Sequence, residues 1–207
     1  MKRLLFISLA VIMVVVLGAC ATKEKKVEFK APNTFTTLKD NSIRYIMRGH
    51  INSTAFYEVV NYAVEHNIPK VIIEIWSPGG SAHEALRIVG IIDEYRDKII
   101  FETRSYSTAW SGGFLVLISG DTGLRFVAKN TSLMWHHVIK VKTKDDKEVK
   151  PDESTKLYDE IFNKYIVLRS SISMIVLLKK IEKEYWYLTS KEAIHYGFAD
   201  GYIPRVK

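Results

Sequence analysis

A length of 207 residues is enough for one globular domain with a sizeable core, preceded by a short leader. The formal net charge of +7 overstates the charge of the mature domain, because Lys2 and Arg3 belong to the leader. Without these two residues, 28 of the 30 basic residues remain, against 23 acidic ones. No basic stripe interleaved with aromatic residues is present, which argues against a nucleic-acid partner.

The first twenty residues resemble a bacterial lipoprotein signal. Lys2 and Arg3 are basic, the run Leu4–Leu17 is almost wholly apolar, and Leu17-Gly18-Ala19-Cys20 closes it. The alternative is a plain membrane anchor, but the apolar run is short against the ~20 residues of a spanning helix. The resemblance implies a signal peptide at 1–19 and cleavage before Cys20. It also implies a lipid such as palmitate on that residue, which would anchor the protein to the membrane of the cell envelope, outside the cytoplasm.

A polar tether is expected to follow at 20–40, and a folded domain at 41–207. Cys20 is the only cysteine, so the mature domain forms no internal disulfide. Basic residues in Lys23-Glu24-Lys25-Lys26 directly follow the lipid site and suit a surface of anionic lipid.

Apolar, β-branched runs in the domain predict strands, and the stretches between them predict helices. In chain order we expect a strand at Ile43–Met47, a helix at about Ser53–Glu65, a strand at Lys70–Trp76, a helix to about Tyr95, a strand at Ile99–Glu102, a helix after Ser111, and strands at Leu124–Val127 and Ser132–His137. This alternation indicates an α/β domain built from βαβ units.

The remaining third of the chain is expected to be mostly helical. Val141–Pro151 is strongly charged and predicts an exposed loop, and Asp152 to about Tyr185 predicts a long helix. Four apolar residues share one face of that helix: Leu157, Ile161, Tyr165 and Leu168. Such a face either packs on the core or binds a partner, and periodicity does not choose between the two. A capped short helix near Leu188–Ala193 and a strand at Gly201–Pro204 should end the chain.

The segment Ser111-Gly112-Gly113 is the candidate centre of the chemistry. It stands between a predicted buried strand and an apolar run that predicts a helix. A serine at such a corner can be exposed as a nucleophile, and the helix N-terminus directs free N–H groups at developing negative charge. The alternative is that Ser111 is only an N-cap, which is a common role for serine.

Two other features could complete a hydrolytic site. Ser77-Pro78-Gly79-Gly80 is a turn at the carboxyl end of a predicted strand, where open α/β sheets place their sites, although such a turn can also exist without a ligand. Its backbone N–H groups, with that of Gly112, could form an oxyanion hole. His136 is the candidate base, and because His137 would point to the opposite face of the strand, at most one of the two can serve.

In this order the motifs resemble the proteolytic subunit of the Clp protease. The resemblance rests on Ser77-Pro78-Gly79-Gly80, Ser111 with Gly113, Arg125-Phe126, Asn130, Met134, His136 and the closing segments Tyr187–Ala193 and Tyr196–Asp200. It covers roughly Arg44 to Ile203. Ser111-Gly112-Gly113-Phe114 is also similar to signal peptide peptidase-type relatives in the same superfamily.

The resemblance implies a crotonase-like spiral of βαβ units, with Asp152–Tyr185 as the family's long handle helix. It implies a serine peptidase in which Ser111 is the nucleophile, His136 is the general base, and the N–H groups of Gly80 and Gly112 form the oxyanion hole. No metal or cofactor is implied. The substrates would be peptides or unfolded proteins, and the subunits would form a homo-oligomeric ring. An ATP-dependent partner is not expected outside the cytoplasm.

One position departs from the family's pattern. The family's triad aspartate lies two residues before the aromatic residue that begins the closing motif, and Tyr185 stands there in this chain. Because a tyrosine cannot orient and stabilise an imidazolium as a carboxylate does, we expect Glu184 or Glu182 to take that role. The alternatives are a Ser–His dyad and a catalytically weak scaffold that binds peptides.

Overall fold

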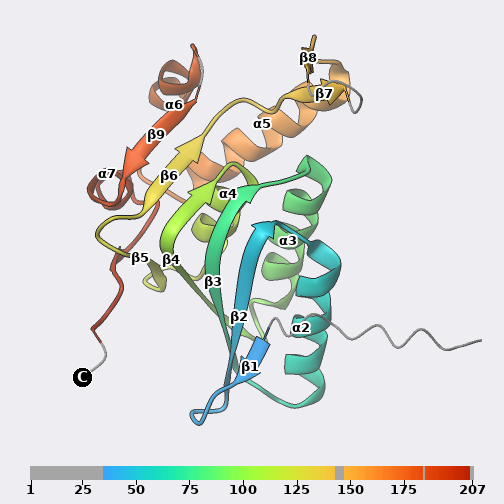
Figure 1. The fold of residues 1–207 in the computed structure, drawn as a ribbon, viewed down its shortest axis with the longest axis vertical. Helices are drawn as coiled ribbons and strands as arrows, with labels where there is room; N and C mark the ends of the chain where they lie inside the picture. The colour runs from blue at the N-terminus through green and yellow to red at the C-terminus, as the bar shows by residue number, and fades with distance from the viewer. Residues whose placement is uncertain (1–34, 143–146, 184, 206–207) are drawn as a thin grey trace, which may run out of the picture. The chain divides into compact units, whose positions relative to one another are not determined.

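The computed structural model describes residues 35–142, 147–183 and 185–205 (Figure 1). The expected signal peptide at 1–19, the lipidation site Cys20 and most of the tether lie outside the described residues, as does Glu184. In the three described ranges, no helix is both long enough and apolar enough to cross a bilayer.

An eight-stranded sheet forms the framework of the domain. Its main path consists of β1 (Phe35–Thr37), β2 (Ser42–His50), β3 (Lys70–Gly79), β4 (Ile100–Trp110), β5 (Arg125–Val127) and β10 (Gly201–Tyr202). The long β4 pairs in parallel with β5 along its middle and with β6 (Ser132–Trp135) at its end, and β9 (Trp186–Thr189) runs antiparallel to β6. The neighbours β2, β3 and β4 are parallel, which is the arrangement that βαβ units produce.

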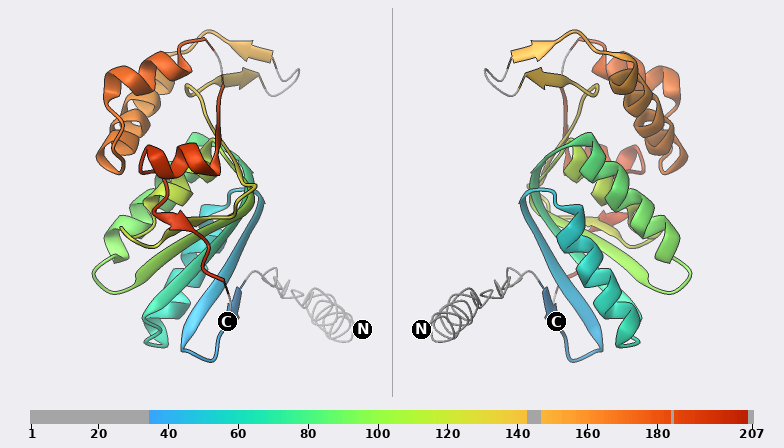
Figure 2. Two further views of the ribbon diagram at one scale, coloured as in Figure 1. Left: turned by 90° about the vertical axis from the view of Figure 1, so that its left-hand side faces the viewer. Right: turned by 90° about the vertical axis from the view of Figure 1, so that its right-hand side faces the viewer.

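The helices gather on one face of this sheet (Figure 2). They are α2 (Ser53–Glu65), α3 (Ala82–Tyr95), α4 (Gly112–Ser119), α5 (Glu153–Leu168), α6 (Met174–Ile181) and α7 (Ser190–His195). Several of these helices have a side-chain cap at the N-terminus. Asn52 caps α2 by accepting a hydrogen bond from the N–H of Ala55, and Thr189 caps α7 in a capping box with Glu192. The predicted α/β class and the capped short helix are therefore confirmed.

The helix that follows Ser111 is buried along its whole length. Every residue of α4 is buried, and the ring of Phe114 lies 5.9 Å from that of Trp135 and 5.0 Å from that of Phe198, measured between centroids. A helix enclosed on all sides needs no polar face, which explains why its sequence is a continuous apolar run. Because Ser111 directly precedes α4, the core of the domain fixes its position.

Several predicted boundaries differ from the structure, among them the end of the strand expected at Ser132–His137, which is Trp135. Part of the expected tether forms β1, where Phe35 packs on Tyr62 with 5.0 Å between ring centroids. The strand expected at Ile99–Glu102 continues to Trp110, because its later residues pair with β5 and β6. The charged loop contains β7 (Lys140–Lys142) and β8 (Lys147–Val149), which pair through their backbones and therefore need no apolar pattern.

The prediction of one long handle helix is wrong, because the chain breaks between α5 and α6. Ser170 Oγ donates to the carbonyl of Ile166 at 2.6 Å, the N–H of Ser171 donates to the carbonyl of Tyr196 at 2.9 Å, and Ser173 caps α6. Serine side chains that bond to the backbone compete with helical hydrogen bonds. A cluster of serines thus ends one helix and starts the next.

The face of α5 that packs on the core differs from the apolar face seen in the sequence, for which core packing and partner binding both stayed open. Phe162 and Ile166 are buried, whereas Leu157 is 57% exposed and Leu168 is 80% exposed. Of the four residues expected to share an apolar face, Tyr165 packs against the core. The helix is amphipathic, but much of its apolar stripe faces solvent in a single chain.

Asp200 joins the C-terminal segment to β5. Its carboxylate accepts hydrogen bonds from the N–H groups of Gly123 and Arg125, and from Arg125 Nη2 at 2.6 Å. The side chain of Arg125 is only 7% exposed, and its Nη1 donates to the carbonyl of Arg169. Burial alone would raise the pKa of Asp200, but the hydrogen bonds and charge of Arg125 outweigh it and hold that pKa below its usual value.

Asp200→Asn is expected to lower the free energy of unfolding by about 3 kcal/mol at neutral pH, because it leaves the buried charge of Arg125 without its partner. Urea unfolding measures this loss. A group with a lowered folded-state pKa stabilises the protein above its unfolded pKa, and the contribution disappears as the pH falls through the folded value. The difference between parent and variant should therefore shrink in acid.

Asp97→Asn is the matched control, since Asp97 is exposed and forms no ion pair with a described residue. We expect it to change stability by less than about 0.5 kcal/mol. A loss at Asp200 no larger than this, or one that does not change between neutral pH and roughly pH 3, would contradict the role assigned to the Asp200–Arg125 pair.

Candidate active site

Ser111 and His136 come together at one edge of the sheet. Ser111 follows the last residue of β4, and His136 follows the last residue of β6, its parallel neighbour. Ser111 Oγ lies 2.9 Å from His136 Nε2, which is within the hydrogen-bond distance that the sequence led us to expect. The N–H of Ser111 also donates to the carbonyl of Met134 at 2.9 Å, which ties the two strand ends together.

Ser111 occupies the N-cap position of α4 but does not cap the helix. Its backbone has φ +50° and ψ −121°, and its side chain makes no capping hydrogen bond. The other described non-glycine residues with positive φ are Asn41 and Asn67, and asparagine tolerates this conformation better than serine does. Strain of this kind, together with a hydroxyl directed at a histidine, is typical of an exposed nucleophile at a strand-to-helix turn.

The predicted glycine turn lies directly against Ser111. Gly79 has φ +102°, and a Cβ atom added to it would lie 2.7 Å from the Cβ of Ser111 and 2.8 Å from the nitrogen of Gly112. A Cβ atom at Gly112 would in turn lie 3.6 Å from the nitrogen of Gly80. The backbone of Gly80 thus passes close to Gly112, and both residues line the same cleft as Ser111.

Ser77, to which the sequence analysis assigned no role of its own within the Ser77-Pro78-Gly79-Gly80 motif, holds this turn. Its buried Oγ donates to the carbonyl of Gly49 at 2.6 Å and accepts the N–H of Gly79 at 3.0 Å. A Cβ atom at Gly113 would lie 3.1 Å from the carbonyl oxygen of Ser77, so the second glycine after Ser111 also permits close approach. The signal in the sequence was a hydroxyl immediately before Pro-Gly-Gly.

The second ring nitrogen of His136 faces a backbone carbonyl. His136 Nδ1 lies 2.5 Å from the carbonyl oxygen of His137. Since a carbonyl oxygen only accepts, Nδ1 carries the hydrogen, and Nε2 keeps its lone pair for the hydroxyl of Ser111. This is the tautomer that a general base requires.

The side chains near the imidazole of His136 differ in the contacts that they make. The ring of Tyr185 packs on that of His136 with 5.1 Å between centroids. Glu182 is exposed and makes no hydrogen bond or ion pair with a described residue, and the expected role of Glu184 lies outside the described residues. His137 turns toward α5, where its Nδ1 lies 2.7 Å from Asp159 Oδ2, so only His136 of the pair contacts Ser111.

A cleft of about 970 Å³ opens in front of Ser111. Apolar side chains form much of its wall: Leu115, Met134, Trp135, Val138, Ile139 and Phe162. The hydroxyl of Tyr158 lies 2.7 Å from Nδ1 of His83, which connects α5 to α3 at the cleft. The hydrogen bond from Lys140, with that from the N–H of Thr155, holds the pKa of Asp152 well below its usual value.

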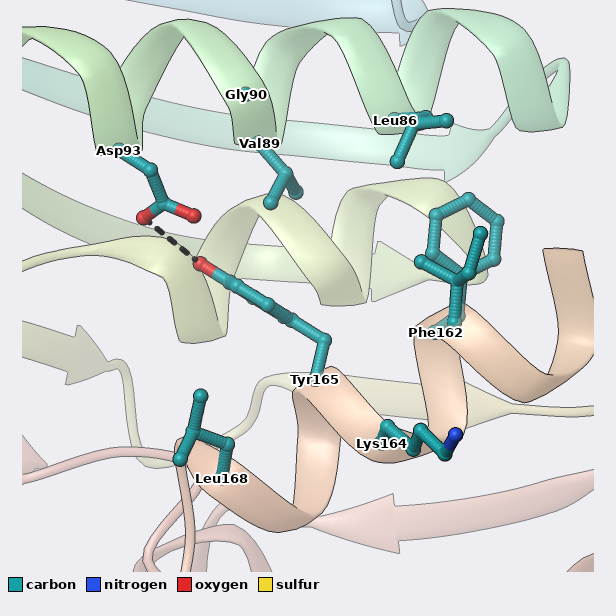
Figure 3. Close-up of a pocket in the computed structure, with 9 residues that line it drawn as sticks. Leu86, Val89, Gly90, Asp93, Phe162, Lys164, Tyr165 and Leu168 are labelled. Carbon is teal, nitrogen blue, oxygen red and sulfur yellow. Dashed lines mark hydrogen bonds between the residues drawn. The ribbon is translucent and has the colours of Figure 1, made fainter.

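A smaller groove of about 340 Å³ lies between α3 and α5 (Figure 3). The Tyr165 hydroxyl donates to Asp93 at 3.5 Å across it, and burial, with the nearby Asp93 carboxylate, raises the pKa of Tyr165 to about 12. No serine, cysteine or histidine lies among the described residues that line it. In the described ranges, no three His, Cys, Asp or Glu residues are placed to hold a metal ion.

Comparisons with known proteins identify the family. The family model described as Clp protease matches residues 46–205. The ATP-dependent Clp protease proteolytic subunit 1 of Bacillus cereus is 28% identical over 137 residues, which are 65% of this chain and 69% of that protein. The family match includes the glycine turn, Ser111, His136 and the closing segment. The chain therefore belongs to the Clp protease family, whose members are serine peptidases.

Proposed function

We propose that this protein is a serine endopeptidase that hydrolyses peptide bonds of unfolded proteins or peptides. The observation that carries the proposal is the 2.9 Å contact between Ser111 Oγ and His136 Nε2, made by a strained serine that does not cap its helix. The adjoining cleft has room for an extended segment of chain, and its apolar wall suits an apolar side chain beside the scissile bond.

The residues have separate roles in this mechanism. His136 Nε2 takes the proton of Ser111 as Oγ attacks the carbonyl carbon, and the N–H groups of Gly80 and Gly112 hold the negative oxygen that forms. The protonated ring then gives its proton to the leaving amine, which leaves an acyl group on Ser111. Water, deprotonated by the same ring, then attacks the acyl carbon, and the bond to Ser111 Oγ breaks as Oγ takes that proton back from the ring, which releases the product acid. We propose that the peptidase works without an ATP-dependent partner, because the location proposed for it outside the cytoplasm has no ATP supply.

A fluorophosphonate probe tests the proposal, because it reacts with activated serines. We expect one labelled residue in the mature domain, located at Ser111 by peptide mass spectrometry, and no label on Ser111→Ala. Ser107→Ala, in the same strand but outside the cleft lining, should label like the parent. A folded parent that takes no label would overturn the peptidase and favour a peptide-binding scaffold, the function that Tyr185 beside His136 would suit.

We further propose that the subunits assemble into a homo-oligomeric ring. Members of the Clp protease family are typically oligomeric. Large apolar side chains are exposed on α5 and α6 in the single chain, where Leu168 is 80% and Ile175 is 81% exposed. Apolar surface of this kind is typical of an interface. Light scattering should give a mass several times that of one chain, and Leu168→Glu should shift it downward, whereas a monomer at all concentrations would contradict the assembly.

We also propose that the protein is a lipoprotein anchored through Cys20 at the bacterial cell envelope and facing outside the cytoplasm. Support comes from Leu17-Gly18-Ala19-Cys20 at the end of a short apolar run. Cys20→Ala is expected to leave an unprocessed precursor that takes up no labelled palmitate, while Thr22→Ala should be processed like the parent. Normal processing and lipid labelling of the Cys20 variant would refute the anchor.

A further inference from the structure

We propose that Asp159 of α5 is a positioning residue for His136, acting through the peptide group that joins His137 to Val138. The inference rests on the function proposed above, because it concerns the base of that reaction. It does not depend on Glu184.

A single carboxylate holds the two residues that follow His136. Asp159 Oδ1 accepts the N–H of Val138 at 2.8 Å, and Asp159 Oδ2 lies 2.7 Å from Nδ1 of His137. A carboxylate only accepts, so His137 Nδ1 carries the hydrogen of this second bond. The first bond holds the peptide group between His137 and Val138, and the second holds the side chain of His137.

That same peptide group contacts the imidazole of His136. Its N–H belongs to Val138 and its carbonyl to His137, and the carbonyl oxygen lies 2.5 Å from His136 Nδ1. Hydrogen bonds in a chain polarise one another, so donation of the N–H to a carboxylate makes the carbonyl oxygen of the same planar unit a stronger acceptor. The charge of Asp159 thus favours the protonated ring without any contact between the two side chains.

Asn163, one turn further along α5, connects Asp159 to Trp135. Its Nδ2 donates to Asp159 Oδ2 at 3.2 Å, and its Oδ1 accepts the indole N–H of Trp135 at 2.9 Å. Residues four apart share one face of a helix, so Asp159 and Asn163 act together on the end of β6. Asn163 and Trp135 are each 2% exposed. The chain is therefore held by α5 on both sides of His136.

This arrangement predicts a kinetic effect without a binding effect. When His136 takes the proton of Ser111, the ring becomes a cation whose Nδ1–H donates to the carbonyl of His137. Asp159 does not line the cleft, so substrate contacts do not include it. Losing its charge should raise the energy of the protonated ring and leave the peptide-binding surface as it is.

Asp159→Asn is the test, because the amide keeps the size of the side chain and an oxygen that can accept the N–H of Val138. On an unstructured fluorogenic peptide we expect kcat to fall roughly tenfold to a hundredfold, the range of one charge-assisted hydrogen bond, with KM changed less than about twofold. Glu160→Gln is the matched control: it removes the same charge from the neighbouring position of α5, where Glu160 pairs with Lys164 at the surface. It should behave like the parent.

A second measurement uses the parent protein and so does not depend on whether the variant folds. In protein with isotope-labelled histidine, the Nδ1–H of His136 should give a far-downfield proton signal, assigned by its loss in His136→Ala. The absence of that signal overturns the proposal, as does parent-like kcat in Asp159→Asn. A variant that loses thermal stability and raises KM in proportion to its loss of kcat would show a purely structural role.

These outcomes are distinct from failure of the proposed function. If the parent takes no fluorophosphonate label at Ser111, the peptidase assignment fails before any comparison of variants. If the parent is labelled and Asp159→Asn is labelled at the same rate, the peptidase stands and only the role of Asp159 is refuted.

Discussion

Ser111→Ala is expected to remove nearly all hydrolysis of an unstructured peptide, and His136→Ala to cost about as much, with kcat lower by a factor of roughly 10⁴ or more in each. The two side chains meet at 2.9 Å and act as one unit. A serine hydroxyl is a weak nucleophile without its base, and the base has no proton to take without the hydroxyl. The double variant should therefore be little worse than either single one.

These losses of kcat are measured from initial rates of peptide hydrolysis by the parent, both single variants and the double variant. His195→Ala is a suitable control, since this histidine is exposed at the end of α7. Glu184→Gln should cost appreciably less than Ser111→Ala if a carboxylate at that position only orients the ring. Losses that add up in the double variant would show that the two residues act separately, and full activity in Ser111→Ala would refute its role as nucleophile.

The meeting of Ser111 and His136 was implied by the resemblance to the Clp protease subunit, and it agrees with the strand pattern because both residues lie at the ends of buried strands. Strand runs are visible in a sequence as apolar, β-branched stretches, and parallel neighbours end at the same edge of a sheet. The two residues are 25 positions apart, and only α4 and the short strands β5 and β6 lie between them. A short crossover of this kind leaves few alternative arrangements.

The contact between Asp159 and His137 could not be predicted in the same way. It joins residues 22 positions apart across a polar hairpin, and the packing angle of α5 on β6 decides which helical residue meets the strand end. Periodicity identified an amphipathic stripe through Leu157 and Leu168 without deciding whether it packs on the core. That stripe is exposed here, whereas Phe162 and Ile166 are buried. A repeat of apolar residues shows that a helix has an apolar face, but the tertiary contacts determine which side of the helix is buried.

Gly79→Ala is expected to abolish the activity of the site, because Gly79 lies directly against Ser111. At φ +102° an alanine is strained by about 1–2 kcal/mol wherever it stands. Here its Cβ would also lie 2.7 Å from the Cβ of Ser111 and 2.8 Å from both the nitrogen of Gly112 and the carbonyl oxygen of Trp110. These atoms belong to the backbone, or lie next to it, at a junction held by a buried helix, so the nucleophile itself has to move.

Gly123→Ala separates the two costs, because Gly123 has φ +87° and a Cβ atom there would meet nothing within 4 Å. Both variants should lose a similar 1–2 kcal/mol from the backbone conformation, about what the left-handed region costs one residue. Only Gly79→Ala should lose fluorophosphonate labelling, by about a hundredfold or more, because a displacement of ~1 Å at a reacting group has that effect. Thermal unfolding and labelling rates of the two variants, measured side by side, decide the matter. If Gly79→Ala is labelled as fast as Gly123→Ala, the backbone at Gly79 accommodates the methyl group without moving Ser111. The close packing of Gly79 against Ser111 is then not what positions the nucleophile.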